Sequence, residues 1–204
     1  MKPLFPILAA TIMTATISSA SAEVNSLAAV QAHLKAVGSM TASFTQTDRG
    51  GKSISGTLSL KRPGKIRFQY EKGVPILIVG DGKALTFIDY SVRQVQRWPI
   101  GNTPLGVLLD PNKDLTRFAR LLPSANPNVV LVEARDKKHP EYGVITLAFT
   151  KADSAPAGLR LDGWVSLDSQ NNRTTIRLAN QQFNAPISDK TFNWSDPRPK
   201  GPRG

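Results

Sequence analysis

The sequence predicts an α+β domain that is mainly antiparallel β, built on an open and strongly curved sheet. Two observations carry this prediction. Short segments alternate between apolar and polar residues, which places the apolar side chains on one face of a strand. Turn residues separate these segments at hairpin spacing, and we count about ten or eleven strands. So many strands with short connections favour a partial barrel over a closed sandwich.

The first 22 residues have the layout of a secretory signal peptide. Lys2 is their only charge, a mostly apolar stretch follows, and Ala20-Ser21-Ala22 forms a small-residue cleavage site. We therefore expect cleavage after Ala22 and export to the periplasm. One domain is predicted over residues 23–195, followed by a disordered basic Pro/Gly tail over residues 196–204.

The residue inventory disfavours catalysis. The chain has no cysteine, which excludes disulfides and thiolate metal sites. His33 and His139 lack metal-ligand spacing and are expected to be surface or helix-flank histidines. Asp81 and Asp89 flank one hairpin and are expected to serve its turns. The sequence therefore predicts a protein that is not an enzyme, with no catalytic residue, no metal and no cofactor.

The net charge is strongly positive, at +11, and the basic residues are spread along the chain. A solvated positive face is the simplest interpretation. The functional alternative is steering toward anionic membrane surfaces or acidic partner proteins. Export disfavours nucleic acid as a partner.

Residues 24–37 are predicted to form the first helix, with Leu27 and Leu34 on a single apolar stripe and Gly38 at its end. An antiparallel meander follows from residue 42 to residue 100. Pro63-Gly64 fits a type II turn, and Asp81-Gly82 fits a hairpin turn with positive φ at both residues. The inward-facing residues of the meander are Leu58, Leu60, Ile66, Phe68, Tyr70, Leu85 and Phe87.

The second half is predicted to begin with helical segments. Residues 103–109 form a short helix that is apolar nearly all round, so another element must cover it. Residues 113–122 are expected to form a further helix. Four strands then follow over residues 129–135, 143–150, 158–167 and 173–178. In the third of these we expect Leu159, Leu161, Val165 and Leu167 on one face and Trp164 on the other.

Four short motifs resemble, in order and spacing, those of the periplasmic outer-membrane lipoprotein carrier family of LolA-like chaperones. They are Ala42-Ser-Phe-Thr-Gln46, Lys61-Arg62-Pro63, Asp81-Gly82-Lys83 and Gly101-Asn-Thr-Pro-Leu105. The resemblance covers most of residues 42–109, and from Pro123 onward only the strand pattern is similar. It implies a half-barrel whose concave face is covered by a helical lid and whose cavity takes acyl chains.

The same resemblance implies the residues of the site. Arg62 is expected to switch the lid by contacting backbone carbonyls of residues 105–109, and an exposed turn arginine is the alternative. Leu105, Leu108 and Leu109 are the lid residues. The inward apolar residues form either an ordinary core or the acyl-chain cavity, and the resemblance implies the cavity. Its lining would be Phe44, Leu58, Leu60, Ile66, Phe68, Tyr70, Leu85, Phe87, Leu27 and Leu34.

The function implied is a monomeric periplasmic chaperone with acylated lipoproteins as cargo. It would accept them from an inner-membrane ABC-type lipoprotein-releasing complex and deliver them to an outer-membrane acceptor lipoprotein or to the outer membrane itself. Three alternatives remain open: a periplasmic sensor on the same half-barrel, a small-lipid or glycolipid-binding module, and an unrecognised hydrolase.

Overall fold

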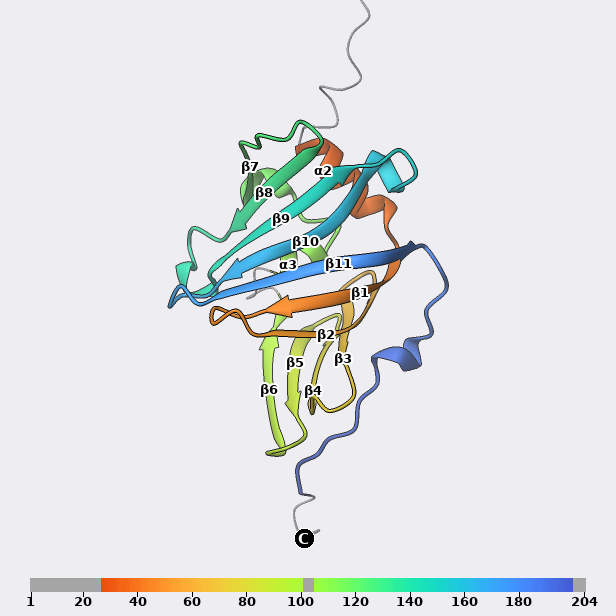
Figure 1. Cartoon of the computed structure of the whole chain (residues 1–204), viewed down its shortest axis with the longest axis vertical. Helices are drawn as coiled ribbons and strands as arrows, with labels where there is room; N and C mark the ends of the chain where they lie inside the picture. Colours follow the sequence, from red (N-terminus) through yellow and green to blue (C-terminus); the bar gives the residue numbers. More distant parts are fainter. Residues whose placement is uncertain (1–26, 101–104, 200–204) are drawn as a thin grey trace, which may run out of the picture.

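The structure, a computed structural model, describes residues 27–100 and 105–199. Within these residues eleven strands form one antiparallel sheet in the order β6-β5-β4-β3-β2-β1-β11-β10-β9-β8-β7. The edge strands β6 and β7 do not pair with each other, so the sheet is open (Figure 1). The predicted fold class is confirmed. The signal peptide lies outside the described residues.

Two meanders make up the sheet. The first contains β1 (Ser39–Thr47), β2 (Ser53–Lys61), β3 (Lys65–Tyr70), β4 (Ile76–Asp81), β5 (Ala84–Asp89) and β6 (Gln94–Pro99). The second contains β7 (Ala119–Leu122), β8 (Val129–Arg135), β9 (Val144–Lys151), β10 (Leu159–Leu167) and β11 (Arg173–Phe183). Helix α2 (Leu27–Ala36) precedes the first meander, and α3 (Gly106–Leu109) lies between the two. The 3₁₀ turns are η2 (Leu115–Arg117), η3 (Pro140–Tyr142), η4 (Pro156–Gly158) and η5 (Asp189–Phe192).

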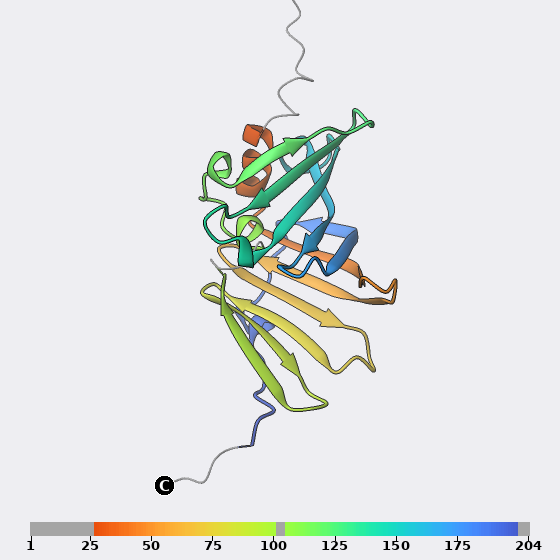
Figure 2. The ribbon, with the colours of Figure 1, turned by 90° about the vertical axis from the view of Figure 1, so that its left-hand side faces the viewer.

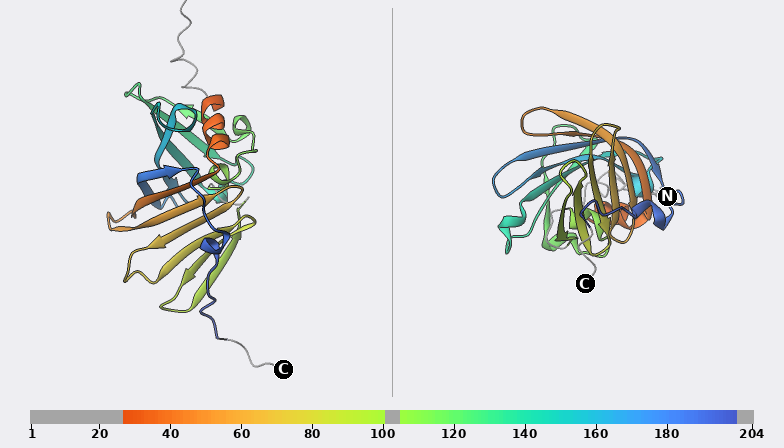
Figure 3. Two further views of the ribbon diagram at one scale, coloured as in Figure 1. Left: turned by 90° about the vertical axis from the view of Figure 1, so that its right-hand side faces the viewer. Right: turned by 90° about the horizontal axis from the view of Figure 1, so that it is seen from below.

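The core lies on the concave side, where the sheet curves around the helices (Figures 2 and 3). Helix α2 contributes Val30 and Leu34, both fully buried, while Leu27 is only half-buried. Alternation along the strands supplies the rest, as in β3, where Ile66 and Phe68 are buried and Arg67 points away. In β3 the period-two pattern of the sequence therefore marks the inner face correctly.

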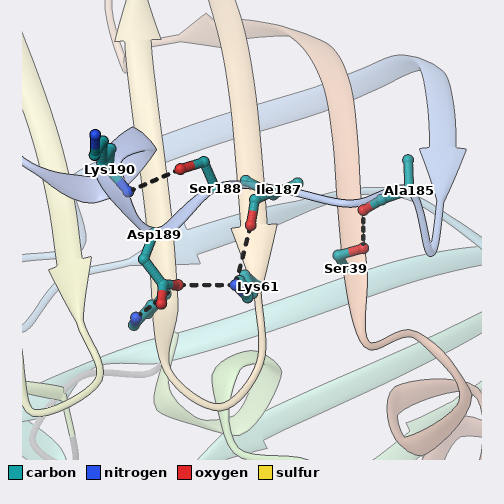
Figure 4. A network of polar contacts seen from close by, with 8 residues as sticks. Ser39, Lys61, Ala185, Ile187, Ser188, Asp189 and Lys190 are labelled. Atoms are coloured by element: carbon teal, nitrogen blue, oxygen red, sulfur yellow. Dashed lines mark hydrogen bonds and ion pairs between the residues drawn. The ribbon is translucent and has the colours of Figure 1, made fainter.

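The convex side carries a C-terminal strap, residues 184–195, which runs across the outside of the first meander (Figure 4). Asp189 forms ion pairs with Lys61 at 2.8 Å and with Lys65 at 2.9 Å, and Lys61 also donates to the Ile187 carbonyl. Phe192 packs into a small apolar cluster on the outer face of β4 and β5. The strap thus covers a face that is left apolar by Leu77, Val79 and Ile88.

Residues 113–122 do not form the predicted helix. Leu115 is buried in the 3₁₀ turn η2, where the Asp114 carboxylate accepts a hydrogen bond from the backbone N–H of Thr116. Residues 119–122 then form β7, which pairs with β8. Three apolar residues at helical spacing predicted a helix. The backbone of residues 119–122 instead forms its hydrogen bonds with β8 at the edge of the sheet.

Trp164 faces the core, which corrects its predicted orientation. Leu161 opposes Phe149 and Gly163 opposes Ala148, so Asp162 is an extra residue in β10 and forms a bulge. One extra residue reverses the alternation, which sends Trp164 inward and Val165 and Leu167 to the convex face. The rings of Trp164 and Phe68 meet edge to face, with centroids 6.1 Å apart.

The two turns of the first meander agree with the prediction in part. The Arg62–Pro63 peptide is cis, and Gly64 has the positive φ, of 72°, that a type II turn requires at its third residue. At the β4–β5 turn only Gly82 has a positive φ, of 98°. Asp81 instead accepts hydrogen bonds from the backbone N–H groups of Lys83 and Ala84 through its side chain, which confirms its predicted role in turn chemistry.

Candidate functional site

The β2–β3 turn caps the C-terminal ends of both helices. A helix leaves its last carbonyl groups without intrahelical partners, and a cation is favoured at that end. Arg62 supplies one at the end of α2, where its guanidinium donates to the Val37 carbonyl and its backbone N–H donates to the Gly38 carbonyl at 2.8 Å. Its other terminal nitrogen, Nη2, donates to the Leu108 carbonyl of α3 at 3.0 Å.

Gly64 in the same turn adds a second bond to the short helix. Its backbone N–H donates to the Leu109 carbonyl at 3.1 Å. Two consecutive carbonyls at the end of α3 are thus held by one turn. The side chains of Leu108 and Leu109 are buried, and Leu105 is half-buried at the other end of the helix. We call α3 with Leu105 the lid.

The Arg62 side chain is an unusual cation because its partners are carbonyl groups. Its contacts among the described residues include no carboxylate, and its Nε atom is buried without a hydrogen-bond partner. Burial lowers its pKa to about 10, so the guanidinium stays charged at neutral pH. A buried charge that is neutralised only by dipoles depends on both helix ends staying in place.

His33 is buried in the core, which corrects its predicted surface position. Its Nδ1 lies 2.8 Å from the Pro156 carbonyl, and since a carbonyl only accepts, Nδ1 carries the proton. Its ring packs edge to face against Phe149, with centroids 5.4 Å apart. Burial lowers the pKa of His33, and the positive charge of Arg62 adds to that effect. The helical spacing contained the signal, because position 33 lies three residues after Val30 on the buried stripe.

An apolar hollow of about 220 Å³ lies on the concave side beside the lid. Of the predicted cavity residues, Phe68 and Leu85 line it together with the lid residue Leu105. The other predicted residues do not line it. Phe44, Leu58, Leu60, Ile66, Tyr70 and Leu34 are buried in the surrounding core, Leu27 packs against that core, and Phe87 is half-buried.

Several walls of the hollow were not predicted from the sequence. Ile78 lies within an uninterrupted apolar run, which gives no alternation to assign its face. Trp164 faces the hollow because of the bulge in β10, which the alternation in the sequence does not reveal. Ile145 and Ile176 come from the second meander, where the sequence predicts the strands without indicating which of their residues reach the hollow.

The hollow is lined mainly by apolar side chains, which suits it to binding apolar groups. The hollow is below the roughly 300–1,000 Å³ of ordinary small-molecule sites. The part of the chain that the structure describes contains no group of three His, Cys, Asp or Glu residues placed to hold a metal ion. Within the same residues no helix is long and apolar enough to cross a bilayer.

Comparison with known proteins decides the family. Residues 35–195 match the family model described as outer membrane lipoprotein carrier protein LolA. The chain belongs to this family. A Chromobacterium violaceum protein named outer-membrane lipoprotein carrier protein is 30% identical over 207 residues, which cover 97% of this chain and 96% of that protein. A Neisseria meningitidis serogroup B protein of the same name is 26% identical over 208 residues, with the same coverage of both chains.

A solved structure shares the fold. It is a DUF1329 family protein from Desulfovibrio piger, with 11% sequence identity and a TM-score of 0.52, and the match covers 81% of this chain and 94% of that one. At this identity the likeness shows the fold alone.

In this member of the carrier family, three of the four recognised motifs meet around the lid or the concave face. Phe44 and Gln46 of the first motif face inward from β1, and Gln46 lines the hollow. Arg62 of the second caps both helices. Leu105, which ends the fourth motif, covers the hollow, while residues 101–104 lie outside the described part of the chain. The Asp81–Lys83 motif forms only the β4–β5 turn.

Proposed function

We propose that this protein is a periplasmic, non-enzymatic chaperone that shields the acyl chains of lipoproteins and carries them from the inner to the outer membrane. The observation that carries the proposal is the lid itself. Leu105 of the lid lines an apolar hollow, and the four-residue apolar helix that follows it is held by hydrogen bonds from one turn. The names of the two relatives support the same function.

Acyl chains need such an escort. A chain of about 16 carbons has about 15 methylenes, and burying each is worth about 0.8 kcal/mol, or near 12 kcal/mol per chain. A lipoprotein that leaves a membrane unescorted exposes its acyl chains to water at the cost of this whole free energy. A carrier therefore has to offer a comparable apolar environment.

The carrier also has to release its cargo, and the closed lid provides for this. The hollow of about 220 Å³ is too small for several acyl chains, so cargo must displace the lid. The contacts of Arg62 and Gly64 with α3 then compete with cargo. Apparent affinity falls by the fraction of molecules that are open, which keeps binding reversible.

The partners follow from this role. The donor would be an inner-membrane ABC-type lipoprotein-releasing complex. The recipient would be an outer-membrane acceptor lipoprotein or the outer membrane itself. The protein would act as a monomer after removal of residues 1–22. Without Lys2 its formal net charge is +10, one less than the +11 of the whole chain, and this charge favours encounter with anionic surfaces.

A release experiment tests the proposal. Proteoliposomes that hold a triacylated lipoprotein and the releasing complex are mixed with the purified mature protein and ATP. We expect ATP-dependent appearance of lipoprotein in the soluble fraction as a one-to-one complex. No release, with free lipid copurifying instead, would support a small-lipid or glycolipid-binding module. Neither release nor bound lipid would support a sensor.

A further inference from the structure

A second hollow adjoins the one beside the lid, and the two share a residue. It has a volume of about 320 Å³ and opens between the β1–β2 turn and the β3–β4 loop. Ile54, Val74 and Ile76 line it together with the charged residues Asp48 and Lys52 of the β1–β2 turn. Gln46 lines both hollows. Its neighbours across the sheet are Ile54 on β2 and Ile176 on β11, and each of these lines a different hollow. Gln46 therefore lies on the boundary between them.

A hydrogen bond fixes Gln46 in this position. The hydroxyl of Tyr70 donates to its Oε1 at 2.7 Å. Tyr70 is only 4% exposed, and burial raises its pKa to about 12, so it remains a donor at neutral pH. The contact joins β3 to β1 across β2. We call it the Gln46–Tyr70 bridge.

A glycine makes the bridge possible. Gly56 on β2 lies directly opposite Tyr70 on β3 and Phe44 on β1. A Cβ atom at Gly56 would lie 2.7 Å from the Phe44 ring and 2.2 Å from the Gln69 carbonyl oxygen. Without that atom the rings of Phe44 and Tyr70 meet over β2, with centroids 5.2 Å apart, and the Tyr70 hydroxyl reaches Gln46.

The bridge is a polar barrier between the apolar hollow beside the lid and the second hollow, which is lined by apolar and charged residues. An acyl chain that extends from the hollow beside the lid toward the second hollow must pass Gln46. To do so it must displace the amide and break its hydrogen bond with Tyr70, and the Tyr70 hydroxyl, which is buried, would then lose its acceptor at a cost in free energy. Short chains that end before the bridge avoid this cost.

We propose that the Gln46–Tyr70 bridge is an acyl-chain length selector, which limits how many methylenes are buried beside the lid before a chain crosses into the second hollow. The inference rests on the proposed acyl-chain site and names its boundary. Affinity should rise about fourfold for each added methylene while the chain fits, because each buried methylene adds a constant free energy. It should level off once the chain end reaches the bridge.

Saturated fatty acids of increasing length, from about 8 to about 18 carbons, measure this limit because each step adds buried methylenes. Each acid displaces an environment-sensitive acyl probe from the purified mature protein. We expect a break in the affinity series for the wild type. Gln46→Ala should move the break to longer chains and leave short-chain affinities unchanged. Tyr70→Phe should move it less, because the ring stays while Gln46 is freed.

Gln182→Ala is the matched control, since Gln182 is an exposed glutamine on β11, and it should keep the wild-type break. Should Gln46→Ala fail to fold, Tyr70→Phe carries the test. An affinity series without a break, or with the same break in all variants, would overturn the selector and leave the acyl-chain site standing. Failure of every acid to bind the wild type would overturn both.

Discussion

Arg62→Leu removes the side chain that ties the lid to the rest of the fold. The guanidinium makes one bond to the lid, at the Leu108 carbonyl, and one to the end of α2, at the Val37 carbonyl. A hydrogen bond from a charged group contributes about 1.5–3 kcal/mol. The bond from Gly64 to Leu109 remains in the variant, so the lid is weakened and not removed.

Loss of the Leu108 bond shifts the balance between closed and open lid by about 10- to 150-fold, since about 1.4 kcal/mol corresponds to a factor of ten. An open lid no longer competes with cargo. We therefore expect the variant to bind acylated lipoprotein more tightly, by up to that factor, and to hand it on more slowly. Equilibrium binding of a fluorescent triacylated lipoprotein, and its transfer to acceptor vesicles, measure the two effects.

Arg67→Leu is the matched control. Arg67 also donates to a backbone carbonyl, that of Asn193 at 2.9 Å, but in the strap on the convex side. We expect wild-type binding and transfer from it. Arg62→Lys should be intermediate, because an ammonium group is a single point charge without the fork that reaches two carbonyls. A folded Arg62→Leu protein with wild-type affinity and wild-type transfer would refute the lid-switch role.

Three further changes test the structure. Burial lowers the pKa of His33, so below pH 6.5 the unfolded chain binds more protons than the folded one. We expect the free energy of unfolding to fall with decreasing pH in this range, by at most about 1.4 kcal/mol per pH unit. Urea titrations of His33→Gln should lack this part of the pH dependence. Phe192→Ala should cost about 3 kcal/mol in urea unfolding and leave binding of the acyl probe unchanged, since Phe192 fills a convex-side cluster; a loss under about 1 kcal/mol would contradict this packing. Gly106→Ala should speed hydrogen exchange in the lid, because the added Cβ would lie 2.7 Å from the Ile100 carbonyl oxygen. The cost of this clash should exceed the gain of about 1 kcal/mol from the better helix propensity of alanine. Slower exchange would show that the lid relaxes around the added methyl group.

The strands were predictable where one face is buried and the other is not. In β3 the alternation of Ile66, Arg67 and Phe68 gave the strand and its inner face correctly. Residues 113–122 have apolar residues at helical spacing as well, and local pattern alone indicated a helix. In the structure residues 119–122 pair with β8 as a strand, and this pairing depends on the tertiary fold and not on the local sequence pattern.

The site was predictable only in part. The resemblance placed Arg62 against the lid, and the structure adds what no spacing reveals, namely that the same side chain also reaches the end of α2. Trp164 was misplaced because a single bulge reverses every later side chain in the strand. Tyr70 was expected among purely apolar residues, and its hydroxyl contact with Gln46 depends on the missing side chain of Gly56.

The order of the strands also dictates how the chain can fold. Every pairing in the sheet joins strands that are consecutive in sequence, except the one between β1 and β11. Each meander can therefore assemble early from local contacts. The pairing of β1 with β11 can form only after β11, the last strand, has been synthesised. Until then the pairing edge of β1 and the apolar inner face of the first meander stay open to other chains. A protein built to keep lipids from aggregating would thus pass through a stage in which it is itself prone to aggregate.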